Sequence, residues 1–280
     1  MKKMVMLIAA LLAAWILAGC GAPETPQAAE TTAVQTQTVV TQAPPTEETE
    51  PPVAARVLPD GVYTVDFETD SGMFRANEAC NGKGTLTVQN GVQTLHVSLQ
   101  SKKILNLYPG TAQEAKEPGA VLLEPTVDTV TYSDGLSEEV FGFDVPVTSV
   151  GQEFDLALIG TKGVWYDHKV SVQNPIPQAG SYSCTVELQG GSGRASVASP
   201  ASLVSDGETL MATIQWSSPY YAYMLVDGVS YDPIQTEGNA TFEIPVELDT
   251  DMVISACTTA MSEPHLVDYT LHFDSSTMKK

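Results

Sequence analysis

The chain has 280 residues, of which 13 are Lys or Arg and 34 are Asp or Glu, giving a net charge of −21 at pH 7. A surface this acidic repels nucleic-acid phosphates and anionic lipid headgroups, so we expect no nucleic-acid partner. The charge does not exclude cations, and its simplest meaning is the solubility of an exposed protein.

The first twenty residues have the layout of a secretory signal. Two lysines precede an apolar run, residues 4–17, and small residues then lead to Cys20. The run contains about 14 residues, fewer than the ~20 that a membrane-spanning helix needs. We therefore predict that residues 1–19 are a signal peptide. An uncleaved membrane anchor is the alternative, and it would leave the location nearly the same.

The cleavage site resembles the bacterial lipobox, in which the cysteine after the cut is diacylated and becomes the first residue of the mature chain. The resemblance implies that Cys20 is the lipidation site of a lipoprotein. The protein would then be anchored through lipid on the extracellular face of the bacterial cell membrane. Two acyl chains hold a protein at a membrane firmly, whereas one chain does not.

A polar segment that contains several prolines follows the cysteine. Residues 21–56 are rich in Ala, Thr, Gln, Glu and Pro and contain no aromatic residue. Such a composition buries too little apolar area to offset the entropy lost on ordering. We predict that residues 20–56 are the lipidated cysteine and a disordered linker, with a coil dimension of roughly 30–35 Å.

From residue 57 onward, apolar and polar residues alternate in many short segments. Alternation with period two predicts strands that bury one face, and Asp-Gly or Asn-Gly pairs between the segments predict tight turns. No long segment has helical periodicity, so we predict an all-β protein of the sandwich type. The expected strands include residues 63–67, 95–99, 141–147, 154–158, 182–188, 210–216, 242–246 and 269–273.

The pattern of strands occurs twice along the chain. Residues 143–147, Phe-Asp-Val-Pro-Val, match residues 242–246, Phe-Glu-Ile-Pro-Val. We predict two modules, residues 57–174 and 178–276. The linker between them is Asn-Pro-Ile-Pro at 174–177, because prolines do not continue a hydrogen-bonded ladder.

Motifs for catalysis are absent from the sequence. There is no nucleophile elbow, no His-Glu-x-x-His and no phosphate-binding loop, so we predict that the protein is not an enzyme. No Cys/His spacing is typical of zinc. Cys184 and Cys257 fall in the same predicted module and could pair. His96 and His272 alternate with apolar neighbours, so we expect them to face solvent.

Two kinds of segment are candidates for ligand binding. Residues 216–224 contain four aromatic residues and one Met, in a chain that is only 7% aromatic. The last hairpin of each predicted module carries Tyr and His at alternate positions, which share a face of a strand. These hairpins are residues 164–170 and 264–269. Tyr or His on an apolar strand face is a suitable axial ligand for an iron porphyrin.

The combination resembles the NEAT (near-transporter) domain, an immunoglobulin-like β-sandwich that many Gram-positive surface proteins use to bind haem or haemoproteins. In that family a short segment with serine and aromatic residues, the lip, follows an early strand. A late hairpin carries Tyr-x-x-x-Tyr, whose first tyrosine ligates iron and whose second supports it. The resemblance implies two tandem immunoglobulin-like β-sandwich modules, haem as cofactor or cargo, and a membrane iron or haem transporter as a partner.

Residues 178–276 resemble the family over nearly their whole length. His265 stands at the first tyrosine of the hairpin motif and would be the ligand of the haem iron, while Tyr269 stands at the second. The lip falls at residues 217–224. The resemblance assigns ligand binding there to Ser217, Ser218, Tyr220, Tyr221 and Met224.

Residues 57–174 are a weaker match. Tyr166 stands at the first tyrosine and would be an iron ligand, with His168 beside it, whereas Val170 replaces the second tyrosine. Residues 101–104, Ser-Lys-Lys-Ile, occupy the lip without an aromatic residue. Donors to haem propionates would be Ser217, Ser218 and Lys102 or Lys103.

The leading hypothesis is therefore a cell-surface lipoprotein that binds haem or another iron compound for uptake. In this hypothesis the second predicted module holds the ligand between residues 217–224 and the hairpin with His265 and Tyr269. The alternative is an immunoglobulin-like adhesion or scaffold module that binds protein or glycan without a cofactor. The tyrosines would then be ordinary strand aromatics, and residues 220–224 would be a contact patch.

Overall fold

The computed structural model describes residues 55–235 and 237–280 and confirms the all-β prediction. This part of the chain contains eighteen strands and two single-turn 3₁₀ helices, η1 (Glu78–Cys80) and η2 (Glu114–Lys116). It includes no helix long and apolar enough to cross a membrane. The signal peptide, Cys20 and nearly all of the predicted linker lie outside the described residues.

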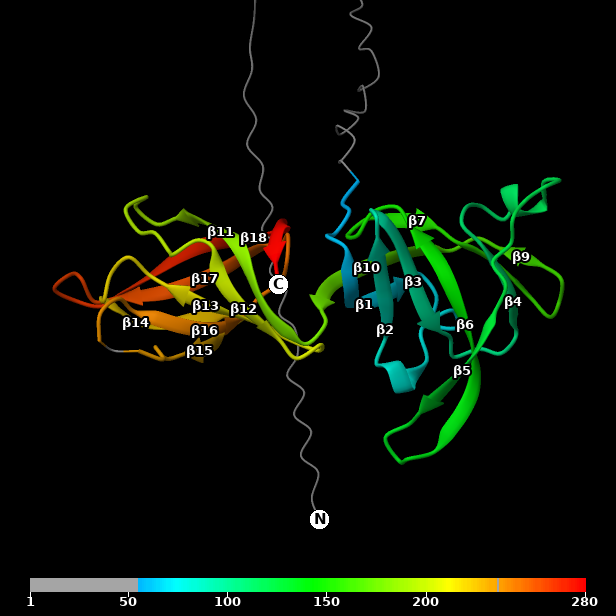
Figure 1. The fold of residues 1–280 in the computed structure, drawn as a ribbon, viewed down its shortest axis with the longest axis horizontal. Helices are drawn as coiled ribbons and strands as arrows, with labels where there is room; N and C mark the ends of the chain where they lie inside the picture. The colour runs from blue at the N-terminus through cyan, green and yellow to red at the C-terminus, as the bar shows by residue number, and fades with distance from the viewer. Residues whose placement is uncertain (1–54, 236) are drawn as a thin grey trace, which may run out of the picture. The chain divides into compact units, whose positions relative to one another are not determined.

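The first ten strands form two antiparallel sheets, coloured blue to green in Figure 1. The seven-stranded sheet has the order β5 (Thr126–Thr131), β6 (Ser137–Val147), β3 (Val92–Ser98), β2 (Lys83–Gln89), β1 (Gly61–Thr69), β10 (Lys169–Pro177) and β7 (Glu153–Asp155). The three-stranded sheet has the order β4 (Ile104–Tyr108), β8 (Ala157–Gly160) and β9 (Trp165–Tyr166).

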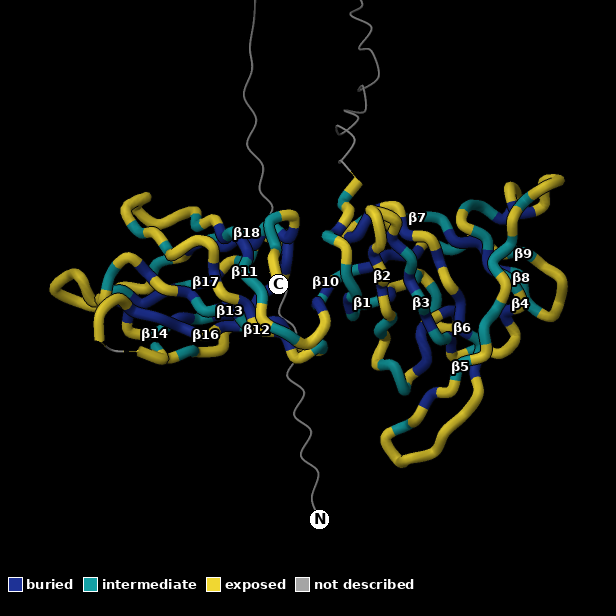
Figure 2. The backbone as a smooth tube through the Cα atoms, in the orientation of Figure 1, coloured by how far each residue is buried: buried dark blue, intermediate teal, exposed yellow. Residues whose placement is uncertain are grey.

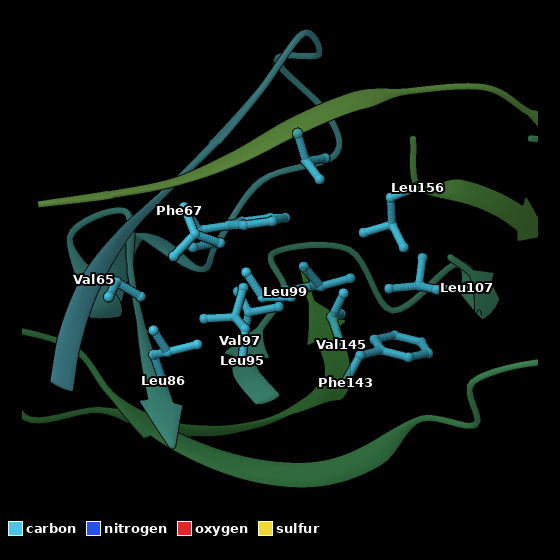
Figure 3. Close-up of a cluster of buried hydrophobic side chains, with 14 of the residues drawn as sticks. Val65, Phe67, Leu86, Leu95, Val97, Leu99, Leu107, Phe143, Val145 and Leu156 are labelled. Atoms are coloured by element: carbon cyan, nitrogen blue, oxygen red, sulfur yellow. The ribbon is translucent and has the colours of Figure 1, made fainter. Parts of the chain in front are cut away.

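Alternate residues of these strands form a single hydrophobic cluster. Leu95, Val97 and Leu99 are all fully buried, whereas the residues between them are not. Figure 3 shows side chains from separate strands pointing toward one another, with Phe67 and Phe143 among them. The period-two pattern of the sequence therefore identified the buried face of these strands correctly.

The expected strand at residues 154–158 is divided in the structure. β7 pairs with β10 of the seven-stranded sheet, whereas β8 pairs with β4 of the three-stranded sheet. Leu156 lies at the switch, fully buried, and its N–H donates a hydrogen bond to the carbonyl of His168 at 3.0 Å. The alternation fixed which side chains are inward but carried no information about a change of sheet.

The remaining strands form an eight-stranded antiparallel sheet, coloured yellow-green to red in Figure 1. Ile234 donates its N–H to the carbonyl of Thr241 at 2.8 Å, so the sheet curls until its two edges approach. Its order is β15 (Val229–Tyr231), β14 (Tyr221–Val226), β17 (Asp251–Thr258), β18 (His265–Lys279), β11 (Gly180–Gly190), β12 (Ala201–Ser205), β13 (Leu210–Gln215) and β16 (Thr241–Pro245).

The two large sheets share a strand order. β6-β3-β2-β1-β10 in one corresponds to β16-β13-β12-β11-β18 in the other. The first strand of each begins with Gly-x-Tyr, and each tyrosine hydroxyl bonds to the carbonyl four residues earlier. Tyr63 bonds to Pro59 at 2.9 Å and Tyr182 to Gln178 at 2.8 Å. This correspondence agrees with the predicted repeat, and the division into two modules stays a prediction. The linker expected at residues 174–177 is instead the end of β10, where Ile176 and Pro177 lie opposite Thr64 and Tyr63 of β1.

The outward face of the seven-stranded sheet carries a polar network around His96. Nδ1 of His96 lies 2.8 Å from a carboxylate oxygen of Asp144, and Nε2 lies 3.1 Å from one of Asp128. Burial alone would lower the pKa of His96, but the bond to Asp144 and the charge of Asp128 together raise it. As expected from the alternation, His96 is on the wet side, with 39% of its side chain exposed.

The raised pKa of His96 predicts a stability term that depends on pH. Charged His96 is favoured in the folded state, so its contribution is fully present below the unfolded pKa of about 6.5 and is lost as pH rises through the higher folded value. His96→Gln should therefore lower the free energy of unfolding at pH 5.5 and lower it less at pH 9, measured by urea denaturation. His265→Gln, at an exposed position, is the control.

Leu95 provides a test of the core. Leu95→Ala should lower the free energy of unfolding by about 2–5 kcal/mol, because it removes buried apolar contact and leaves a cavity. Val92 begins the same strand but is 65% exposed, so Val92→Ala should change stability by no more than about 0.5 kcal/mol. Equal losses in the two variants would contradict the burial pattern.

Candidate functional site

A cavity of about 930 Å³ opens beside the three-stranded sheet. Its walls come from segments that are far apart in the sequence: the loop after β1, the loop before β4, and the turn between β8 and β9. The lining residues are 71–75, 100–104 and 160–162, together with Leu158, Tyr166 and His168. The cavity therefore contains the lip and the hairpin residues that were predicted for the first module.

The break between β9 and β10 places Tyr166 and His168 in the cavity wall. Tyr166 pairs with Leu158 of β8, and the ladder then stops until Lys169 begins β10. The side chain of Tyr166 is half-exposed, while Val170 is buried in the hydrophobic cluster. Tyr166 and His168 share the cavity lining, whereas Val170, which alternation places on the same face, is in the core because it lies on β10, beyond the break in the ladder.

Asp70 holds the ring of His168. A carboxylate oxygen of Asp70 lies 2.7 Å from Nδ1 of His168, and the other accepts the N–H of Lys169 at 3.1 Å. The bond from the Lys169 backbone, followed by the bond from His168, lowers the pKa of Asp70. The Phe74 ring packs against the imidazole with centroids 5.3 Å apart. Two contacts thus restrict the orientation of a side chain at the cavity.

The position of Asp70 follows from strand pairing. β1 pairs with β10 so that Thr69 lies opposite Val170, and Asp70, the residue directly after β1, donates its N–H to the carbonyl of Lys169 at 3.0 Å. Sequence reasoning missed Asp70 because its partner is far along the chain. An acidic residue directly after a strand was the only local signal.

Four cations surround the cavity: Arg75, Lys102, Lys103 and Lys162. No Asp or Glu is among the described residues that line it. Lys102 is paired with Glu138 at 2.9 Å on the side of the β5–β6 hairpin. In a chain with 34 acidic and only 13 basic residues, this concentration of positive charge favours an anionic ligand.

Three of the seven candidate residues of the eight-stranded sheet, Tyr221, Met224 and Tyr269, lie in its core. The Tyr221 ring stacks on Trp216 with centroids 4.0 Å apart, and the hydroxyls of Tyr221 and Tyr269 are 3.1 Å apart. The indole N–H of Trp216 donates to the sulfur of Met224 at 3.4 Å. Tyr221, Met224 and Tyr269 therefore pack against other side chains, so they do not form an open surface for a ligand.

The other candidates of this sheet are at the surface. Ser217 accepts the N–H of Ser196 through its hydroxyl, and the Ser218 hydroxyl accepts the N–H of Tyr220, each at 3.2 Å. Tyr220 is 55% exposed. His265 is exposed at the start of β18, whereas Tyr269 on the same strand is buried. His265 and Ser217 are thus exposed, whereas the aromatic residues Trp216, Tyr221 and Tyr269 are buried.

Cys184 and Cys257 are not paired, contrary to the possibility raised by their positions in the sequence. The Cys184 sulfur lies 3.0 Å from the carbonyl of Asp274, whereas Cys257 is opposite Leu266. Those two β18 residues are roughly 25 Å apart at the rise of an extended strand. A disulfide needs Cα atoms within about 7 Å, so the pair is too far apart to form one.

Comparisons with known proteins do not assign the chain to a family. No family model matches the sequence, and no curated protein matches it. Within residues 55–235 and 237–280, no group of three or more His, Cys, Asp or Glu side chains is arranged to hold a bare metal ion.

The role of Tyr269 is testable by removing one atom. Tyr269→Phe should lower the free energy of unfolding by about 1–3 kcal/mol, because it leaves the buried Tyr221 hydroxyl without its partner. The same variant should leave the absorbance change on hemin addition unaltered. Tyr220→Phe, at the exposed position, should alter neither quantity. Weaker hemin binding by Tyr269→Phe at unchanged stability would return the ligand site to the eight-stranded sheet.

Proposed function

We propose that this chain binds haem, or another anionic iron compound, in the cavity beside the three-stranded sheet. The observation that carries the proposal is the meeting of four cations with Tyr166 and His168 in one cavity. Haem has a flat apolar ring, two propionates and an iron that accepts Tyr or His as a ligand. The cavity offers groups suited to all three parts.

The size and walls of the cavity support this proposal. Its volume of about 930 Å³ lies within the range of small-molecule sites, roughly 300–1,000 Å³. Phe74, Ile104 and Leu158 are buried apolar residues that line it. Met73 is 83% exposed at the same place, so a bound ring would remove an apolar side chain from water.

The site in this proposal differs from the one the sequence favoured. The leading hypothesis placed the ligand against His265 and Tyr269, and the buried packing of Tyr269 does not support that location. Lys102 and Lys103, which the resemblance offered as donors to propionates, line the cavity. With a lipid on Cys20, the chain would capture its ligand outside the membrane and pass it to a transporter there.

The alternative proposal is binding of another protein without a cofactor. Tyr220, Met261 and Leu266 are each at least half-exposed. The first two lie on loops that are joined by the hydrogen bond from Thr259 N–H to the Tyr220 carbonyl at 2.8 Å. Exposed apolar side chains that gather on neighbouring loops are typical of protein contact surfaces.

A hemin titration tests the first proposal. The full chain, purified in detergent, should give a saturable shift of the Soret band beyond that of empty micelles. Lys103→Ala with Lys162→Ala should weaken the affinity by roughly 2- to 30-fold, because each partly exposed ion pair contributes about 0.2–1 kcal/mol.

A second double variant controls for net charge. Lys83→Ala with Lys116→Ala removes the same number of charges from places outside the cavity lining, so the affinity for hemin should stay unchanged. An unaltered chain that gives no saturable shift would eliminate haem as the ligand. An equal loss in both double variants would mean that overall charge, and not this cavity, governs binding.

A further inference from the structure

We propose that His168, and not Tyr166, is the side chain that ligates the iron, and that Asp70 is the residue that positions it. This inference rests on the proposed haem binding and assigns the roles within that site. It departs from the resemblance, which implies a tyrosine at position 166 as the ligand. The two side chains differ in the contacts that they make.

The imidazole of His168 is held through one nitrogen only. Nδ1 lies 2.7 Å from the Asp70 carboxylate, so Nδ1 carries the proton that this bond requires. In the neutral ring Nε2 then carries the lone pair, and among the described residues Nε2 has no hydrogen-bond partner. With 18% of the side chain exposed, the ring is largely enclosed yet still reaches the cavity. A neutral imidazole with one free nitrogen is the form that binds metal.

Asp70 is itself fixed by the backbone. It accepts the N–H of Lys169 at 3.1 Å and donates its own N–H to the carbonyl of Lys169 at 3.0 Å. The ring of Phe74 packs against the imidazole of His168, with 5.3 Å between the ring centroids. A carboxylate bonded to the outer nitrogen of a ligating histidine sets its tautomer and orientation and raises its basicity. His168 therefore has the support that an iron ligand requires.

Tyr166 lacks comparable support. In the described part of the chain its hydroxyl has no hydrogen-bond partner, and the side chain is 48% exposed. Val170, where the resembled family has its supporting tyrosine, is buried and apolar. A phenol needs help to lose its proton near neutral pH, whereas imidazole does not. Tyr166 is better placed to pack against the edge of a bound ring.

The test is the spectrum of ferric haem bound to the full chain in detergent. A phenolate ligand gives a phenolate-to-iron charge-transfer band, and an imidazole ligand does not. We expect no such band in the unaltered chain and the same spectrum in Tyr166→Phe. His168→Gly should change the Soret position, and added free imidazole should restore it. Far-ultraviolet circular dichroism of each variant verifies folding, and His168→Gln gives a second variant for the same comparison.

Asp70 is tested by affinity and spectrum together. Asp70→Asn should weaken binding of ferric haem by about 10- to 100-fold, the usual effect of losing such a supporting carboxylate, and should shift the Soret band. Asp66→Asn is the matched control on the strand that precedes Asp70, because Asp66 bonds to Lys83 and Asn174, which do not line the cavity.

The outcomes separate the two proposals. A Soret shift that persists unchanged in both His168 variants, and is lost in Tyr166→Phe, would overturn the assignment of His168 while haem binding stands. A loss in Asp70→Asn that Asp66→Asn reproduces would overturn the role of Asp70. An unaltered chain without a saturable shift would overturn haem binding itself, and with it this assignment.

Discussion

The long strands of this protein bury one face, and that constraint organises the core against which the candidate site is built. Alternate residues of β3 belong to the hydrophobic cluster or are buried beside it, while the residues between them are more exposed. Figure 2 shows buried and more exposed positions following one another along the strands. At Leu156 the chain passes from β7, which pairs with β10, to β8, which pairs with β9. The pairing is therefore interrupted between β9 and β10. The cavity opens at that interruption, so the site is a product of strand pairing.

The cavity differs from the chain as a whole in the sign of its charge. The chain is strongly acidic, yet the described lining contains Arg75 and three lysines and no carboxylate. Asp70 does not line the cavity, and its carboxylate oxygens bond to Nδ1 of His168 and to the N–H of Lys169. An anionic ligand would therefore meet a local positive field on a protein that repels anions elsewhere. This contrast explains why the cavity is a better candidate than the exposed loops of the eight-stranded sheet.

Much of the fold could be predicted from the sequence because period two reports burial directly. The inward positions of β3, β6 and β13 follow the alternation that Leu95, Phe143 and Ile214 represent. Pairing order did not follow from it, since the same pattern suits any neighbour. The two Gly-x-Tyr starts are a second repeat in the sequence, but three residues are too short a match to indicate a shared hydrogen bond, which only the structure shows.

The candidate site was only partly predictable. Tyr166, His168 and residues 101–104 were identified from the sequence, and they share one cavity. The aromatic segment at 216–224 suggested a binding surface, but composition does not distinguish a surface cluster from a core. Trp216 and Tyr221 proved to be core residues that stack on each other. Asp70 had no distinguishing pattern, because its role arises from a partner brought near by the β1–β10 pairing.

The most direct test of the account is an experimental structure of the chain after exposure to hemin. We expect porphyrin density against residues 71–75 and 101–104, with iron next to His168 and the propionates toward Lys103 and Lys162. Density beside His265 and the Ser217–Tyr220 loop would contradict the location of the site. A structure that takes up no porphyrin at saturating hemin would contradict the account as a whole.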